Sequence, residues 1–380
     1  MLVPTDHVTS RSPRRGQLDG TRAGRFGEVR IDHVRYLVAD LTEWTGELLD
    51  GYGFTELARS TVCAADKAPV AVMVGSGEIR VVLCQVGDGD NAASAFVQVH
   101  GDAVVDIALV IHDAAAAFEA AIRRGGRPVA APTTRGGVVT AVIGGVGDVV
   151  HTLIERKEGV SAHALPGFVV TAAPDSDSVV SAGTGLRKVD HLAICVGAGQ
   201  LDEVVRYYHE VLDFRTVFAE RIKVGAQAMN SKVVQSRCGA VTLTLLEPDV
   251  AGEPGQIDDF LKNHRGPGVQ HLALQTDNIV TSVAALREHG VEFLSAPSQY
   301  YGVIGERFDP TRHSLAQLSA LDILADQDHS GQLFQIFARS VHSRQTFFFE
   351  IIERAGATTF GAGNVKSLYQ AMKFDVARQA

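Results

Sequence analysis

Two histidines and one glutamate, widely separated in the sequence, have the side-chain types of a metal site. His191 and His271 each begin an apolar, alternating segment, and Glu350 lies in a third such segment further on. Two neutral imidazoles and one carboxylate on one face of an ion leave its other positions open, which suits non-haem Fe(II) and dioxygen chemistry. The same donors also accept Mn or Zn, so the residue types alone do not choose the metal.

The surroundings of Glu350 favour a functional role over a structural one. A single histidine in a strand is more often a structural residue than a ligand. A glutamate within the apolar run 347–352 is harder to explain, because an ionised carboxylate in such surroundings is costly unless it is paired or bound to a metal. We therefore predict that His191, His271 and Glu350 are the metal ligands and form the catalytic centre.

Three strands must bring these side chains together. The segment 190–196 alternates, with His191, Ala193 and Cys195 on one face. Segments 269–273 and 346–352 have the same period, and segments 201–212 and 279–289 show the apolar spacing of amphipathic helices. If the strands curl into one cup, all three candidate ligands can point into it.

The chain repeats itself. Each half opens with a similar strand, and two later segments also correspond in order and spacing: Ile31-Asp32-His33-Val34 with Val189-Asp190-His191-Leu192, Asp106-Ile107-Ala108-Leu109 with His271-Leu272-Ala273-Leu274, and Leu153-Ile154-Glu155-Arg156 with Ile351-Ile352-Glu353-Arg354. We predict an α+β protein of four βαβββ modules that form two open-barrel domains. In the first half His33, Asp106 and Thr152 stand where the second half has its ligands, so we expect that half to have kept the fold without a metal.

Composition divides the chain and limits its partners. We expect a disordered tail at 1–28, a metal-free domain at 29–156, a linker at 157–188 and a catalytic domain at 189–380. A formal net charge of −9 disfavours nucleic-acid and anionic-membrane binding. The sequence has no apolar run of the roughly 18 residues needed to span a bilayer, and no signal-peptide pattern is expected in the tail. Four scattered cysteines without a CxxC pair suit a reducing cytoplasm.

Longer motifs carry a family resemblance. From about Val29 the chain resembles the 4-hydroxyphenylpyruvate dioxygenase family, within the vicinal oxygen chelate superfamily and its glyoxalase/bleomycin-resistance-like fold. The matching runs are Gly268-Val-Gln-His-Leu-Ala-Leu274, Glu292-Phe-Leu-Ser295, Gln332-Leu-Phe-Gln-Ile-Phe337, Phe347-Phe-Phe-Glu-Ile-Ile-Glu-Arg354 and Phe360-Gly-Ala-Gly-Asn364. The resemblance implies Fe(II) held by His191, His271 and Glu350, with 4-hydroxyphenylpyruvate and O2 as substrates. Relatives are often dimers or tetramers, and we expect a homodimer.

Within that family the chain looks most like the 4-hydroxymandelate synthases. The runs Val224-Gly-Ala-Gln-Ala-Met-Asn-Ser231 and Gly239-Ala-Val-Thr-Leu-Thr-Leu-Leu-Glu-Pro248 carry this likeness. Homogentisate-forming members typically have Asn, Phe and Pro where this chain has Leu246, Val365 and Thr244. The implied product is 4-hydroxymandelate with CO2, a precursor of 4-hydroxyphenylglycine for non-ribosomal peptide antibiotics.

Three alternatives stay open. The first is a homogentisate-forming dioxygenase of tyrosine catabolism, which shares fold, metal and substrate. The second is another vicinal oxygen chelate enzyme, such as an extradiol dioxygenase or a glyoxalase, which the run Phe360–Asn364 disfavours. The third is a metal-free small-molecule binding module, which the intact ligand set disfavours.

The resemblance also assigns a substrate pocket. The polar positions near the two ends of the substrate are matched by Ser231, Thr244, Gln256 and Gln335. The aromatic walls are matched by Phe337 and Phe360, the aliphatic positions are Leu246 and Val365, and Asn364 is a polar position next to the C-terminal segment. For Ser231 and Phe337 a purely structural role is the alternative. We expect Gln270 to support His271 without being a ligand itself, and because Gln270 precedes His271 in a strand, we expect its side chain on the opposite face. We expect a C-terminal lid helix from Val365 to about Lys373.

Overall fold

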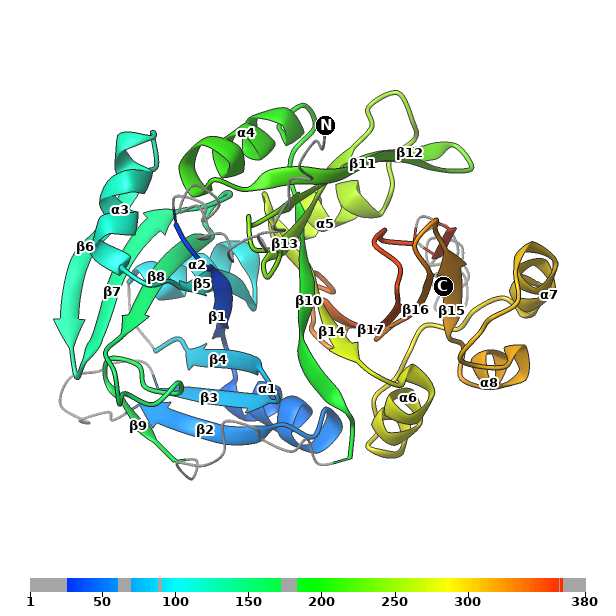
Figure 1. The fold of residues 1–380 in the computed structure, drawn as a ribbon, viewed down its shortest axis with the longest axis horizontal. Coiled ribbons are helices and arrows are strands. Elements are labelled where there is room, and N and C mark those ends of the chain that lie inside the picture. Colours follow the sequence, from blue (N-terminus) through cyan, green and yellow to red (C-terminus); the bar gives the residue numbers. More distant parts are fainter. Residues whose placement is uncertain (1–25, 61–69, 88–90, 172–182, 362, 365–380) are drawn as a thin grey trace, which may run out of the picture.

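The computed structural model describes residues 26–60, 70–87, 91–171, 183–361 and 363–364 (Figure 1). Nearly all of the predicted tail, the whole predicted lid helix and Val365 therefore lie outside the described residues. Among the described helices, none has the length and apolar character needed to cross a bilayer.

The first half holds two βαβββ modules and one further strand. Its elements are β1 (Arg30–Val38), α1 (Leu41–Gly46), the π-helix η1 (Glu47–Gly51), β2 (Thr55–Ser60), β3 (Ala71–Ser76), β4 (Ile79–Gln85), α2 (Ala92–His100), β5 (Ala103–Val110), α3 (Ala114–Arg123), β6 (Pro128–Arg135), β7 (Val138–Gly144), β8 (Val150–Arg156) and β9 (Phe168–Val170). The short strand β9 lies within the stretch expected to be a linker, where it pairs with β2.

The second half repeats the same order and adds helices before its last three strands. Its elements are β10 (Leu186–Cys195), α4 (Leu201–Leu212), β11 (Arg215–Val224), β12 (Gln227–Gln235), β13 (Thr242–Pro248), α5 (Gln256–His264), β14 (Gly268–Thr276), α6 (Ile279–Glu288), α7 (Ser298–Arg307), α8 (Leu315–Ala320), β15 (Leu324–Gln327), β16 (Gln332–Phe337) and β17 (Phe348–Ala355). The predicted helix 201–212 is confirmed, and it is followed by the cap residue Asp213, whose φ of 57° is left-handed.

Each half forms one curled sheet (Figure 1). The strand orders are β6-β7-β8-β5-β1-β4-β3-β2-β9 and β11-β12-β13-β10-β14-β17-β16-β15. In both sheets the two modules join through the antiparallel pairing of their first strands, β1 with β5 and β10 with β14. The predicted α+β architecture of four βαβββ modules in two open barrels is confirmed.

Alternation along the central strands separates the core from the cup. On β10, Leu192 and Ile194 belong to a large apolar core that also contains Val34 and Tyr36 of the first half. Complete burial of such side chains contributes about 1.5–3 kcal/mol each. The opposite face of β10 carries His191 and Ala193, so the core between the halves fixes which face of the strand looks into the cup.

Two β-bulges interrupt this alternation beside the candidate ligands. Val189 pairs with Leu274 and His191 with Ala273, so Asp190 is an extra residue on β10. Ala193 pairs with His271 and Ile194 with Val269, so Gln270 is an extra residue on β14. A bulge re-aims the side chains around it, and each of these bulges lies directly before a histidine.

Candidate metal centre and substrate cavity

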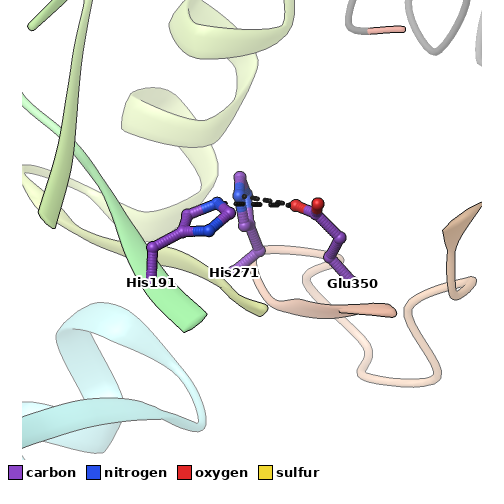
Figure 2. A group of neighbouring side chains, drawn as sticks. All are labelled: His191, His271 and Glu350. Atoms are coloured by element: carbon purple, nitrogen blue, oxygen red, sulfur yellow. Dashed lines mark ion pairs between the residues drawn. The ribbon is translucent and has the colours of Figure 1, made fainter. Parts of the chain in front are cut away.

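His191, His271 and Glu350 point toward one another from β10, β14 and β17 (Figure 2). The Nε2 atoms of His191 and His271 lie 3.6 Å and 3.4 Å from Oε2 of Glu350. One donor atom from each residue lies within 4.8 Å of the others, and this is the only such ligand cluster in the described part of the chain. The predicted residues therefore come together at one point.

The bulged residues hold the two imidazoles. Nδ1 of His191 donates to Oδ1 of Asp190 at 2.8 Å, and Nδ1 of His271 donates to Oε1 of Gln270 at 3.2 Å. With Nδ1 carrying the proton, Nε2 of each ring keeps its lone pair for an ion, as is usual for metal-bound histidines. Burial and then the neighbouring His191 lower the pKa of His271 well below its usual value, which favours the neutral, ligating form.

The third ligand is a buried carboxylate. Glu350 is 1% exposed, and burial raises its pKa. Its Oε1 accepts a 2.6 Å hydrogen bond from Nε2 of Gln335, whereas Oε2 faces the two imidazoles. Two neutral nitrogens and one buried carboxylate oxygen, each with its other polar atom already engaged, fit a divalent cation and leave it open on the cavity side.

The three candidate ligands line one cavity together with thirteen further residues. Seven of the predicted pocket residues line it: Ser231, Thr244, Leu246, Gln256, Gln335, Phe337 and Phe360. Phe360 meets the ring of His191 edge-on, with 5.1 Å between the ring centres. The cavity is thus continuous with the metal centre, and apart from the three candidate ligands it is lined by seven apolar and six polar side chains.

The structure places two pocket residues differently from the sequence-based expectation. Gln270 supports His271 through a hydrogen bond, as expected, but its expected orientation was wrong. It lines the cavity, because the bulge at Gln270 breaks the alternation that would have turned its side chain away. Asn364 is not among the lining residues and lies behind Gln335, whose Oε1 accepts from its Nδ2 at 2.8 Å. Val365 lies outside the described residues.

Five lining residues were missed from the sequence. They are Phe218, Glu220 and Ile222 on β11, Met229 on β12 and Ile257 on α5. The alternation of β11 could have suggested that 218, 220 and 222 share a face. Only the pairing of β11 with β12, in which Glu220 lies opposite Ser231, shows that this face looks into the cavity.

One polar atom in the cavity wall has no hydrogen-bond partner among the described residues. Oγ1 of Thr244 is buried, although Thr244 lines the cavity. Buried hydroxyls are normally satisfied by protein, water or ligand. Thr244 is therefore a position at which a bound molecule could form a hydrogen bond.

The first half shows what the same positions do without the ligand set. Oγ1 of Thr152 donates to Oδ2 of Asp106 at 2.5 Å, and the backbone N–H of Thr152 donates to Oδ1 at 2.9 Å. Nδ1 of His33 bonds to Oδ1 of Asp32 at 2.8 Å. Asp106 is thus engaged by Thr152 and does not form a ligand cluster with His33.

Known proteins with similar sequences match nearly the whole chain. A family model for "Hydroxyphenylpyruvate dioxygenase, HPPD, N-terminal" matches residues 26–165, and one for the "Glyoxalase/Bleomycin resistance protein/Dioxygenase superfamily" matches residues 188–336. The 4-hydroxyphenylpyruvate dioxygenase of Yarrowia lipolytica is 33% identical over 92% of both chains. The chain belongs to the 4-hydroxyphenylpyruvate dioxygenase family.

Other members of this family share its length and fold. The 4-hydroxyphenylpyruvate dioxygenase of Dictyostelium discoideum is 31% identical over 90% of this chain and 97% of its own. A triple mutant of 4-hydroxymandelate synthase from Streptomyces coelicolor has a similar structure, with a TM-score of 0.83 and 34% identity over 91% of this chain and 98% of its own. The family thus includes relatives with two different names and one fold.

Proposed function

We propose that this chain is an Fe(II)-dependent dioxygenase that converts 4-hydroxyphenylpyruvate and O2 to 4-hydroxymandelate and CO2. The observation that carries the choice of product is the position of Leu246. Its side chain lines the cavity in an apolar cluster with Met229 and Ile257, where homogentisate-forming relatives typically have an asparagine. An aliphatic wall offers the substrate ring no hydrogen bond there.

His191, His271 and Glu350 would hold the iron through Nε2, Nε2 and Oε2. When bound, Fe(II) supplies the chelation of an α-keto acid and the redox chemistry with O2. The chain itself supplies the position of each donor: Asp190 and Gln270 fix the tautomers of the histidines, and Gln335 engages the second oxygen of Glu350. These contacts hold the donors at one end of the cavity before any ligand arrives.

The cavity would orient the substrate and exclude water. We assign Phe337 and Phe360 to the walls that confine the aromatic ring. Ser231, Thr244 and Gln256 are the polar groups that could receive its hydroxyl or carboxylate. Reacting atoms must lie within about 3–3.5 Å of each other, so a small shift of the ring redirects attack between the benzylic carbon and the ring. The shape of the wall at Leu246 therefore bears directly on the product.

We also propose that the two halves of the chain have different functions. Residues 29–156 would serve as a metal-free scaffold and residues 189–380 as the catalytic domain. The hydrogen bonds between Asp106 and Thr152 support this division. A homodimer and a place in peptide-antibiotic supply are further predictions from the resemblance, and a cytoplasmic location is a prediction from the scattered cysteines.

A second product deserves a direct test. The curated relatives at 30–33% identity carry the name 4-hydroxyphenylpyruvate dioxygenase, which favours the homogentisate-forming activity. The protein should be loaded anaerobically with Fe(II), mixed with 4-hydroxyphenylpyruvate and O2, and its product identified. The two candidate products are isomers with the same mass, so the product must be identified by NMR or by chromatography against standards. Homogentisate as the main product would refute the proposed function in favour of the alternative.

A further inference from the structure

One buried ion pair connects a metal ligand to the wall of the cavity. Asp190, whose carboxylate accepts from Nδ1 of His191, also accepts from Nε and Nη2 of Arg354 at 2.7 Å and 2.8 Å. The carboxylate is therefore held on two sides, by the guanidinium of Arg354 and by the imidazole of His191.

Arg354 reaches onward to Phe360. Its Nη1 donates to the carbonyl oxygen of Thr359 at 2.7 Å, and its guanidinium carbon lies 4.9 Å from the centre of the Phe360 ring. That ring in turn packs edge-on against His191. Asp190, Arg354 and Phe360 thus close a loop of contacts around one face of the His191 imidazole.

The first half contains the same arrangement. Asp32 is the extra residue of a bulge on β1, as Asp190 is on β10. It contacts His33 on one side and both terminal nitrogens of Arg156 on the other. Nε of Arg156 donates to the carbonyl oxygen of Ala164 at 3.1 Å, in the segment that follows β8. The duplication has therefore kept the aspartate, the histidine and the arginine in both sheets.

The two copies are closely matched except for the ligands. The side chains of Asp32 and Arg156 are 3% and 10% exposed, and those of Asp190 and Arg354 are 8% and 17% exposed. In the first half no described cluster of ligands surrounds His33. The first half therefore has the pair without the candidate ligand set, so it provides a matched comparison for what the pair contributes apart from metal binding.

We propose that Asp190 and Arg354 are positioning residues that set the affinity of the metal centre and seat Phe360, whereas Asp32 and Arg156 serve the fold only. The ion pair orients His191 before the metal binds, and Arg354 joins that ligand to the cavity wall. A change at either residue should disturb both metal binding and the seating of the substrate. This inference rests on the proposed metal-dependent function but not on the identity of the product.

The test compares four variants of the full chain. Asp190→Asn and Arg354→Lys alter the pair beside the metal centre, and Asp32→Asn and Arg156→Lys are their matched controls. Each is measured for Fe(II) affinity by anaerobic competition with a chromophoric chelator, and for thermal unfolding without metal. We expect the second-half variants to bind Fe(II) about tenfold to a hundredfold more weakly. The first-half variants should lose comparable thermal stability but keep wild-type affinity.

A kinetic measurement tests the contact with Phe360. Arg354→Lys keeps the charge but loses the planar fork that reaches both Asp190 and the backbone. At saturating Fe(II) it should raise KM for 4-hydroxyphenylpyruvate severalfold, while Arg156→Lys should leave KM unchanged. If Asp190→Asn does not fold, Asp190→Glu, which keeps the charge, takes its place.

The outcomes separate the two claims. In one outcome the wild type binds Fe(II), the second-half variants bind Fe(II) as tightly as the first-half variants, and Arg354→Lys and Arg156→Lys have equal KM values. That outcome overturns the inference and leaves the proposed function standing. If the wild type binds no metal, the proposed function fails first and the inference fails with it.

Discussion

The side-chain amide of Gln335 donates a 2.6 Å hydrogen bond to Oε1 of Glu350. The orientation of that amide is fixed from behind, because its Oε1 accepts from Nδ2 of Asn364 at 2.8 Å. Asn364 is completely buried and also contacts the hydroxyl of Tyr300. This chain of contacts leaves Oε2 of Glu350 to face the two imidazoles, so Gln335 and the residues behind it determine which oxygen is presented to a metal.

Replacement of Gln335 by methionine should weaken metal binding. Gln335→Met keeps the length of the side chain but removes the donor, so Glu350 is free to rotate. Fe(II) affinity should fall about tenfold or more, as is typical when a contact that orients a ligand is lost. Gln332→Met is the control, because Gln332 is buried on the same strand but bonds to Thr311 instead. Equal affinities in the two variants would contradict this role for Gln335.

Removal of the charge on Glu350 should stabilise the metal-free protein. Burial raises the pKa of Glu350, which means that its ionised form is costly where no cation is bound. Glu350→Gln should therefore unfold at a higher temperature than the wild type when both lack metal. Added Fe(II) should raise the unfolding temperature of the wild type only, and Glu350→Gln should have no turnover. A variant that is still stabilised by Fe(II) would remove Glu350 from the ligand set.

Thr244 should matter for substrate binding and not for stability. Its unpartnered hydroxyl contributes no hydrogen bond within the described protein, so Thr244→Val should leave the free energy of unfolding unchanged or higher. If the hydroxyl bonds to substrate, KM for 4-hydroxyphenylpyruvate should rise about twofold to tenfold. In Thr242→Val, loss of the 3.0 Å bond from Gln235 should have the opposite result: lower stability and unchanged KM. A Thr244→Val variant with wild-type KM would show that the hydroxyl does not contact substrate.

The fold and the residues of the candidate metal centre could be predicted because their signals are local or repeated. Alternation at His191 and helical spacing at 201–212 are short-range patterns that the core between the sheets reinforces. The duplication aligns His191 with His33 and indicates which copy has the complete candidate ligand set. A carboxylate at Glu350 within an apolar strand was anomalous enough to mark the third ligand without any structural information.

What the sequence could not supply was register. A bulge shifts the side chains that follow it, and the residue types at Asp190 and Gln270 do not predict a bulge at either position. The lining residues Phe218, Glu220 and Ile222 depend on how β11 pairs with β12, which is a contact between strands and not a pattern within one. The role of Asn364 behind Gln335 likewise depends on a contact between distant segments.

Glu47 should make stability depend on pH. Burial and then Glu43 raise its pKa to about 7. Its Oε2 lies 3.6 Å from Nε2 of His342, but burial lowers the pKa of His342 to about 4, so that ring is neutral near pH 7 and does not compensate the carboxylate. In the unfolded chain Glu47 ionises near its usual pKa of 4.5. The folded protein therefore binds the extra proton between about pH 4.5 and 7, and the Glu47 contribution to stability declines as pH rises through that range.

The difference between wild type and Glu47→Gln isolates this effect. His342 acts in the opposite direction, since its lowered pKa makes stability rise between about pH 4 and 6.5, but it is present in both proteins. Denaturant unfolding should show a small difference at pH 5 that grows to about 3 kcal/mol in favour of the variant at pH 8. Glu43→Gln, at an exposed position, should show a much smaller change with pH. A constant difference from pH 5 to pH 8 would mean that Glu47 titrates normally.

The product should respond to Leu246 and Val365 together. Leu246 lines the cavity and is 7% exposed, so an asparagine there would place an amide against the bound ring. Val365 lies outside the described residues, and its replacement follows from the family comparison of sequences alone. Leu246→Asn with Val365→Phe should convert part of the product from 4-hydroxymandelate to homogentisate, because the amide offers a new hydrogen bond and the phenyl ring adds volume. Leu246→Met keeps the wall apolar and should therefore form no homogentisate. Chromatography against both standards measures the ratio, and a double variant that turns over but still forms only 4-hydroxymandelate would show that these two positions do not direct the attack.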